Sequence, residues 1–234
     1  KSTPLLSEEF DQKINILISV DSKEIEKNSK DYKFNQIGEH NVKFKFSEKI
    51  NMDNMFKNIP NLVSVEMNST TNTKILSMSN SFENCSSLKK IKIEGFDTSK
   101  IKSMKKLFYK TNLETIDFSK LNLSELEDIS YIFSSTSLQN FSFSSFPVTN
   151  NLKNISGAFK NCSFLKEIDV STISHINSIQ DFSYTFKNCV SLLNLDLSSL
   201  NTGNAVNMAH MFEGCVTISS IDISNFDTKS VIDM

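Results

Sequence analysis

One pattern repeats seven times along the chain and constrains its fold more than any other feature. A phenylalanine recurs every 25 to 27 residues, and an apolar triplet with i, i+3, i+5 spacing follows each one. Repetition at such a period indicates units that bury their apolar faces only against their neighbours. The repeated phenylalanines are Phe56, Phe82, Phe108, Phe133, Phe159, Phe186 and Phe212.

Two apolar spacings alternate within each unit. The last two members of a triplet, such as Leu195 and Leu197, are two residues apart and predict a short strand, stacked on its copies as a parallel sheet. Apolar residues at i, i+3, i+6 and i+7 in 101–108 predict a short helix. Each unit is therefore expected to run strand, turn, helix and cap.

The residue two positions after the phenylalanine predicts how each helix ends. Asparagine and glycine tolerate the left-handed conformation of a helix C-terminal cap. The third and fourth units carry Lys110 and Ser135 there, so their turns are expected to differ. The other five residues are Asn58, Asn84, Asn161, Asn188 and Gly214.

The unit as a whole is similar to the repeats of BspA-like leucine-rich repeat surface proteins, whose units read roughly FDTSNVTDMSxMFxxCxxLxxLDLSx. FENCSSLKKIKIEGFDTSKIKSM (82–104) and FKNCVSLLNLDLSSL (186–200) resemble that unit, and the resemblance covers about residues 50–234. It implies an α/β right-handed leucine-rich-repeat solenoid with a concave parallel sheet and short convex helices. Proteins of that family occur on the surfaces of bacteria, notably wall-less ones, and of protists. The resemblance therefore also implies a role in adhesion and no enzyme activity. One departure is a row of phenylalanines where the common repeat has an asparagine ladder: Phe96, Phe146 and Phe226.

The chain divides into a segment without repeats, 1–47, and the repeats, 48–234. Alternating apolar residues predict one strand from Ile14 to Val20 and a hairpin around Gly38 that includes Val42 to Phe46. We expect this segment to cap the exposed first unit, with a separate binding module as the alternative. Met234 aligns within an eighth unit, which leads us to expect a longer natural protein.

Composition and motifs argue against several classes of function. A formal net charge of −2 gives no global field that attracts nucleic acid, and no apolar run is long enough to span a membrane. Only 5 glycines are present, and no phosphate-binding glycine loop occurs. When the repeats are aligned, nearly every candidate catalytic or metal-binding residue is explained by its repeat position. Neither enzyme activity nor a cofactor is therefore expected.

The four cysteines occupy one repeat position, which isoleucine or threonine holds in the other units. Such exchange indicates buried packing rather than catalysis or metal binding. A disulfide between stacked neighbours is sterically conceivable, but free thiols are the expectation. The residues at this position are Cys85, Cys162, Cys189 and Cys215, with Ile59, Thr111 and Thr136 in the remaining units.

Outward-facing strand residues are the candidate partner-binding surface, because they line the expected concave face. Stacked aspartates in the later units should repel one another. The functional interpretation is a ligand or cation site, and the alternative is a solvated face. The candidates are Glu66, Lys89, Lys90, Lys92, Asp117, Asp169, Asp196 and Asp222.

Six N-x-[ST] sequences are possible glycosylation sites if the protein passes through a eukaryotic secretory route. About as many are expected by chance from the composition, so they say nothing about secretion. The asparagines are Asn68, Asn84, Asn122, Asn140, Asn154 and Asn161.

These observations and the resemblance lead us to expect a non-enzymatic recognition or adhesion module, on the cell surface or secreted, that binds a protein or glycan. The alternative is a structural protein that assembles end to end or laterally into filaments or a matrix. An intracellular scaffold is a third possibility. Neither nucleic acid nor a membrane span within this chain is expected, although an anchor could lie outside it.

Overall fold

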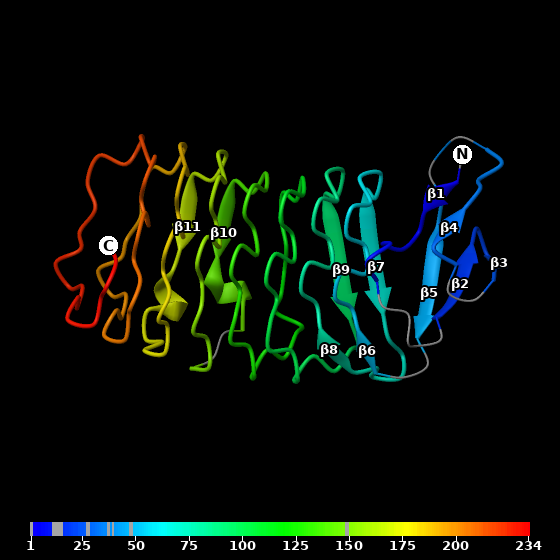
Figure 1. Ribbon diagram of the computed structural model, residues 1–234, viewed down its shortest axis with the longest axis horizontal. Helices are drawn as coiled ribbons and strands as arrows, with labels where there is room; N and C mark the ends of the chain where they lie inside the picture. The colour runs from blue at the N-terminus through cyan, green and yellow to red at the C-terminus, as the bar shows by residue number, and fades with distance from the viewer. Residues whose placement is uncertain are drawn as a thin grey trace.

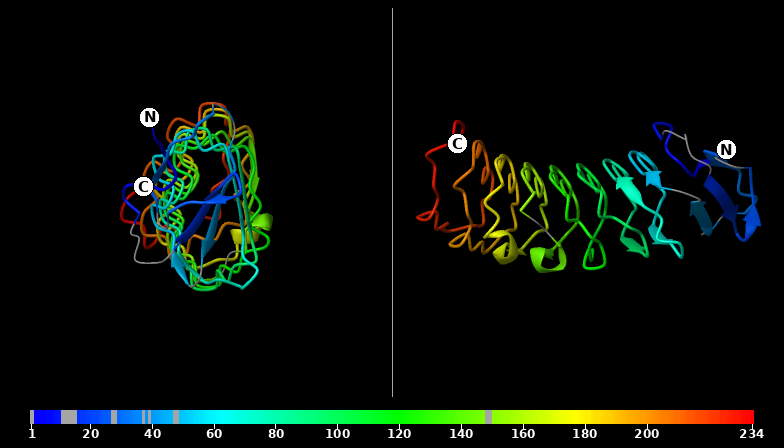
Figure 2. Two further views of the ribbon diagram at one scale, coloured as in Figure 1. Left: turned by 90° about the vertical axis from the view of Figure 1, so that its right-hand side faces the viewer. Right: turned by 90° about the horizontal axis from the view of Figure 1, so that it is seen from below.

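From residue 50 onward the chain winds into a row of similar coils that lie one behind another (Figures 1 and 2). The computed structural model describes residues 2–10, 16–26, 29–36, 38, 40–46, 49–147 and 150–234. Its strands are β1 (Thr3–Pro4), β2 (Ile16–Val20), β3 (Lys23–Glu24), β4 (Asp31–Tyr32), β5 (Val42–Phe46), β6 (Ile50–Asn51), β7 (Ser64–Asn68), β8 (Ile75–Ser77), β9 (Lys90–Glu94), β10 (Asn140–Ser142) and β11 (Glu167–Asp169). Two 3-10 helices, η1 (Phe143–Ser145) and η2 (Ser171–Ile173), follow β10 and β11.

The triplet segments pair in parallel, one repeat apart, but they do not form a continuous sheet. β7 pairs with β9 through five residue pairs, and β10 pairs with β11 through three. An isolated bridge from Glu167 to Asn194 reaches the next coil. Residues 111–118 of the third coil are described but carry no strand. The strands are therefore short local pairings between neighbouring coils.

The segments expected to be helices are ladders of turns. In the third coil, Leu107 N–H closes a turn onto the Met104 carbonyl at 3.1 Å, whereas Phe108 N–H donates to the next coil, to the Ile132 carbonyl, at 2.9 Å. Lys106 N–H likewise reaches Ser130 O at 2.9 Å. Backbone donors therefore alternate between their own coil and the neighbouring one, which an α-helix cannot allow because its N–H groups bond within the helix.

Left-handed residues enforce this alternation. In every coil, the residue two positions before the phenylalanine is left-handed, and so is the residue two positions after it. An α-helix needs consecutive right-handed residues instead. Lys110 (φ 57°) and Ser135 (φ 60°) share this conformation, so the cap itself is the same in the third and fourth coils. The expected difference lies just after it, because residues 86–87 form a turn before the triplet, whereas residues 111–113 and 136–138 carry none. The left-handed residues are Asn54, Asn58, Asn80, Asn84, Lys106, Lys110, Tyr131, Ser135, Gly157, Asn161, Tyr184, Asn188, His210 and Gly214.

The predicted α/β class, a right-handed leucine-rich-repeat solenoid with a concave sheet and convex helices, was wrong. The described residues form small parallel and antiparallel sheets, turns and two 3-10 helices, with no α-helix among them. Helix and turn ladder bury the same side chains: Met104, Leu107 and Phe108 are all fully buried. Side-chain spacing alone does not distinguish the two.

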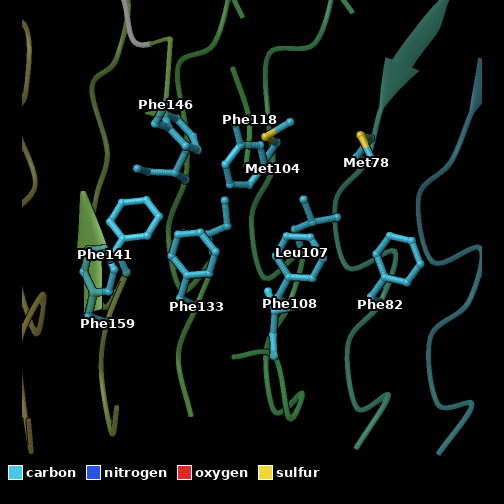
Figure 3. Close-up of a cluster of buried hydrophobic side chains, with 14 of the residues drawn as sticks. Met78, Phe82, Met104, Leu107, Phe108, Phe118, Phe133, Phe141, Phe146 and Phe159 are labelled. Carbon is cyan, nitrogen blue, oxygen red and sulfur yellow. The ribbon is translucent and has the colours of Figure 1, made fainter. Parts of the chain in front are cut away.

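A column of stacked phenylalanine rings runs through the core. Phe108 lies 5.7 Å from Phe82 and 6.0 Å from Phe133, centroid to centroid, with interplanar angles of 11° and 7°. Figure 3 shows these rings in one row, with Phe118 and Phe146 beside them. The repeat interval places each ring directly over its copy in the next coil, so the column extends from Phe56 to Phe212.

The N-terminal segment forms its own small sheets and packs on the first coil. β2 lies between β3 and β5, and β1 pairs with β4, all antiparallel. The expected hairpin around Gly38 was therefore wrong, because the strands on either side of it pair elsewhere. Phe44 lies 5.4 Å from Phe56, and Ser7 N–H donates to the Met55 carbonyl at 2.9 Å.

Two earlier expectations for this segment fall partly outside the described residues. Ile14 and the boundary at residues 47–48 are among the undescribed positions, so the division at 47 stays a prediction.

In the part of the chain that is described, no helix has the length and apolar character needed to cross a bilayer.

Candidate binding surface on the strand face

The predicted partner-binding residues are all exposed. We call the surface formed by outward-pointing side chains of the triplet segments the strand face. Inward neighbours such as Ile168 and Leu195 are 8% exposed, so the strands present alternate residues to core and solvent. The exposed residues are Glu66, Lys89, Lys90, Lys92, Asp117, Asp169, Asp196 and Asp222.

Two of the three lysines of the strand face are paired with carboxylates, and Lys90 forms no ion pair with any described residue. Lys92 Nζ lies 3.0 Å from Glu94 and 3.6 Å from Glu66, and Lys89 lies 3.8 Å from Glu114. The hydrogen bond that Lys92 donates to the Glu94 carboxylate is the main cause that raises the pKa of Lys92. Glutamates of the same and adjacent coils therefore compensate the charges of Lys89 and Lys92 at this end of the strand face.

The later coils carry unpaired acidic groups. Asp169, Asp196 and Asp222 form no ion pair with any residue that the structure describes. Each carboxylate instead accepts the backbone N–H of the serine two residues later, at 2.9 Å. These hydrogen bonds hold the carboxylates in a defined orientation.

The same hydrogen bonds lower the pKa of these aspartates. For Asp196 the largest cause is the hydroxyl of Ser198, followed by its backbone N–H. The charge of Asp222 acts in the opposite direction and is the smallest cause. The predicted repulsion along the aspartate row therefore exists but does not decide the protonation state.

An open depression of about 560 Å³ lies on this acidic part of the strand face. Asn140, Glu167 and Asn194 form one side of it, two positions before Ser142, Asp169 and Asp196. Ser142 Oγ donates to Asp169 Oδ2 at 2.8 Å. The depression therefore combines carboxylate acceptors with amide groups that both donate and accept.

Sequence reasoning missed Glu167 and Asn194 as lining residues. They belong to the same face because positions i and i+2 of a strand point to one side. The sequence shows that alternation, so it could have identified both residues. It does not show the depression, which depends on side-chain lengths in three successive coils.

The cysteines are free thiols in the core. Cys85, Cys162 and Cys189 are 0% exposed, and Cys215 is half-buried. Each Sγ–H donates to a backbone carbonyl of the previous coil at 2.9 to 3.1 Å. Burial raises the pKa of Cys85 to about 12 and that of Cys162 to about 11, so both thiols are un-ionised at neutral pH. The packing interpretation is confirmed for the three buried cysteines.

Several predicted glycosylation sites have structural contacts. Asn84 Nδ2 donates to Asn58 at 2.7 Å, and Asn161 accepts from Asn188 at 2.9 Å. Asn122 and Asn154 accept backbone N–H groups within turns. Asn68 and Asn140 are exposed at the ends of β7 and β10. Glycosylation at any of the six stays a prediction.

Metal coordination finds no arrangement to support it in the described ranges. No group of three or more histidine, cysteine, aspartate or glutamate side chains is placed there to hold an ion. The aspartate row is exposed and spread along the stack, with one carboxylate per coil.

The repeats of the chain match a described protein family. No curated protein matches the chain, and no solved structure does. The family described as "Mycoplasma protein of unknown function, DUF285" matches residues 50–172 and 153–234. These ranges start at the first coil and together cover more than half of the chain, so the chain belongs to the DUF285 family.

Proposed function

We propose that the protein is a non-enzymatic recognition or adhesion module that acts on the cell surface or outside the cell. The observation that carries the proposal is the depression on the strand face, where Asp169 and Asp196 present carboxylates without a counter-ion among the described residues. The resemblance to BspA-like surface proteins supports the same role.

The strand face suits recognition because its polar groups are held in place before any partner arrives. Backbone N–H groups orient the aspartates, and the inward residues of the same strands are buried. A partner therefore loses little affinity to ordering this surface. Carboxylates next to the amides of Asn140 and Asn194 favour a protein loop bearing ammonium groups or a glycan bearing hydroxyls.

The test is binding of the labelled protein to a glycan array and to a panel of purified extracellular-matrix proteins. We expect at least one ligand to be retained, and the double variant Asp169→Asn/Asp196→Asn to weaken its binding tenfold or more. Asparagine keeps the oxygen that accepts the serine N–H, so the turns remain while two charges are lost.

The matched control is Glu24→Gln/Glu26→Gln, which removes two charges from exposed positions of the N-terminal segment. Equal effects of the two double variants, or no retained ligand, would contradict the proposal. Light scattering that grows into fibres with concentration would favour the structural alternative instead.

A further inference from the structure

A second polar surface lies on the turn ladders of the third to sixth coils. We call it the lysine–tyrosine surface and define it by Lys105, Lys106, Lys110, Lys160, Tyr109, Tyr131 and Tyr184. Its residues flank the repeated phenylalanines and are distinct from those of the strand face. No feature of the proposed function uses them.

The lysines of this surface contact tyrosine rings. Lys106 and Lys110 place Nζ 5.4 and 5.2 Å from the Tyr109 ring centroid. Lys160 Nζ lies 5.9 Å from Tyr131 and 5.0 Å from Tyr184. These cation–π contacts attract the ammonium groups but leave their charge uncompensated.

Across the described ranges, the lysines at the centre of this surface have no carboxylate partner, and the nearby charge of Asp181 is felt by Tyr131 instead. Among the described residues, Lys105, Lys106, Lys110 and Lys160 form no ion pair. The residues that directly follow the repeated phenylalanines form a row along the coils. At the ends of this row, by contrast, Lys57 lies 3.8 Å from Glu83 and Lys187 lies 2.7 Å from Glu213. Positive charge is therefore concentrated between two acidic boundaries.

A pocket of about 360 Å³ opens within the surface, and Ser134 lines it. Ser134 is the shortest side chain in its row, with Tyr109 and Lys160 on the adjacent coils, so the row has a notch there. Its side chain is 1% exposed, and Oγ has no hydrogen-bond partner within the described structure. A buried hydroxyl without a partner is costly, and a bound acceptor would satisfy it.

The backbone also favours a role beyond folding. Lys106 (φ 53°), Tyr131 (φ 56°) and Tyr184 (φ 58°) occupy the first left-handed position of their turns, where the first two coils have Asn54 and Asn80. Bulky residues adopt this conformation at a free-energy cost that asparagine and glycine largely avoid. The residues that build the surface are therefore not those that stabilise the turns best.

We propose that this pocket binds a sulfate or phosphate ester carried on a sugar. Lysine supplies point charges that suit a tetrahedral oxyanion, and the chain contains no arginine for planar bidentate recognition. The Ser134 hydroxyl donates to one ester oxygen, and the Tyr131 ring offers an apolar surface to the sugar ring.

The size of the surface favours a short glycan over nucleic acid. In the row that follows the repeated phenylalanines, Tyr109 is next to Glu83 and Lys187 is next to Glu213. Three coil spacings of about 4.8 Å separate these two positions, a distance of roughly 15 Å. That length accommodates about two or three sugar rings. A longer polyanion would meet the carboxylates at either end.

The experiment is isothermal titration with a sulfated heparin disaccharide, its unsulfated counterpart, glucose 6-phosphate, inorganic sulfate and an oligothymidine. We expect one of the esterified sugars to bind with a dissociation constant of roughly 1 mM or below. The unsulfated disaccharide should bind at least tenfold more weakly. The two esterified sugars distinguish a sulfated source from a phosphorylated one.

The variant Lys106→Gln/Lys160→Gln should weaken that binding tenfold or more. The matched control is Lys100→Gln/Lys153→Gln, which removes the same charge where the lysines pair with Glu125 and Glu127, and it should change binding less than twofold. Ser134→Ala should weaken binding severalfold without lowering the melting temperature, because it removes a buried hydroxyl that has no partner in the free protein. Equal effects of the two double variants would overturn the proposal, as would equal affinity for the unsulfated sugar or for inorganic sulfate.

Tighter binding of oligothymidine than of either esterified sugar would also overturn it, in favour of a nucleic-acid surface. This inference is independent of the proposed function. Asp169→Asn/Asp196→Asn should leave binding of the esterified sugar within twofold, so a failure at one surface does not count against the other.

Discussion

Truncation of a ring in the middle of the phenylalanine column should be far more damaging than truncation at its end. Phe108 is 0% exposed and stacks on rings in both neighbouring coils, 5.7 and 6.0 Å away. Loss of a buried phenylalanine to alanine costs about 3–5 kcal/mol, and each aromatic pair contributes about 0.5–1.5 kcal/mol. With two stacked partners, Phe108→Ala should cost about 4–5 kcal/mol, a large share of a typical domain's stability.

Phe212 provides the matched comparison. It is half-buried, and among the described residues it stacks on one ring, that of Phe186 at 6.1 Å. Phe212→Ala should therefore cost about half as much, roughly 2 kcal/mol. Phe108→Leu keeps most of the buried volume and should cost about 1–2 kcal/mol.

Urea unfolding followed by far-UV circular dichroism measures these differences through the midpoint and the slope. The slope must be checked in each variant, because repeat arrays can lose cooperativity. If Phe108→Ala destabilises no more than Phe212→Ala, the stacked column is not what stabilises the coils.

Three further predictions concern the strand segment, the aspartate row and the thiols. Leu195→Asp puts a charge at a position that is 8% exposed, so it should unfold the neighbouring coils; a thermal melt within a few degrees of the parent would contradict this. The lowered pKa of Asp196 stabilises the fold above the unfolded pKa, and this contribution is lost as pH falls from about 4 through the folded value. Asp196→Asn should accordingly flatten the fall of the urea midpoint between about pH 5 and pH 3, and an unchanged pH dependence would refute that assignment. Ellman's reagent without reductant should label all 4 cysteines in denaturant and the three buried ones only slowly in the native protein; equal rates in both states would contradict their burial.

Much of the candidate site was readable from the repeat alignment. Alternation in each triplet predicts which side chains face outward, and Asp169 and Asp196 are exposed as expected. The charge pairing of Lys92 with Glu94 and Glu66 was not readable, because it depends on distances between side chains of adjacent coils. The same holds for the notch at Ser134, whose walls come from the coils on either side.

The sequence by itself determined the repeat, its period and the apolar columns, because inward burial depends only on where large side chains recur. It did not determine the backbone that carries them. The spacing of Met104, Leu107 and Phe108 suits an α-helix and a turn ladder equally, and each buries all three. The tertiary structure decided between them, because the adjacent coil offers carbonyls to alternate N–H groups, and left-handed residues on both sides of each phenylalanine direct those groups toward it.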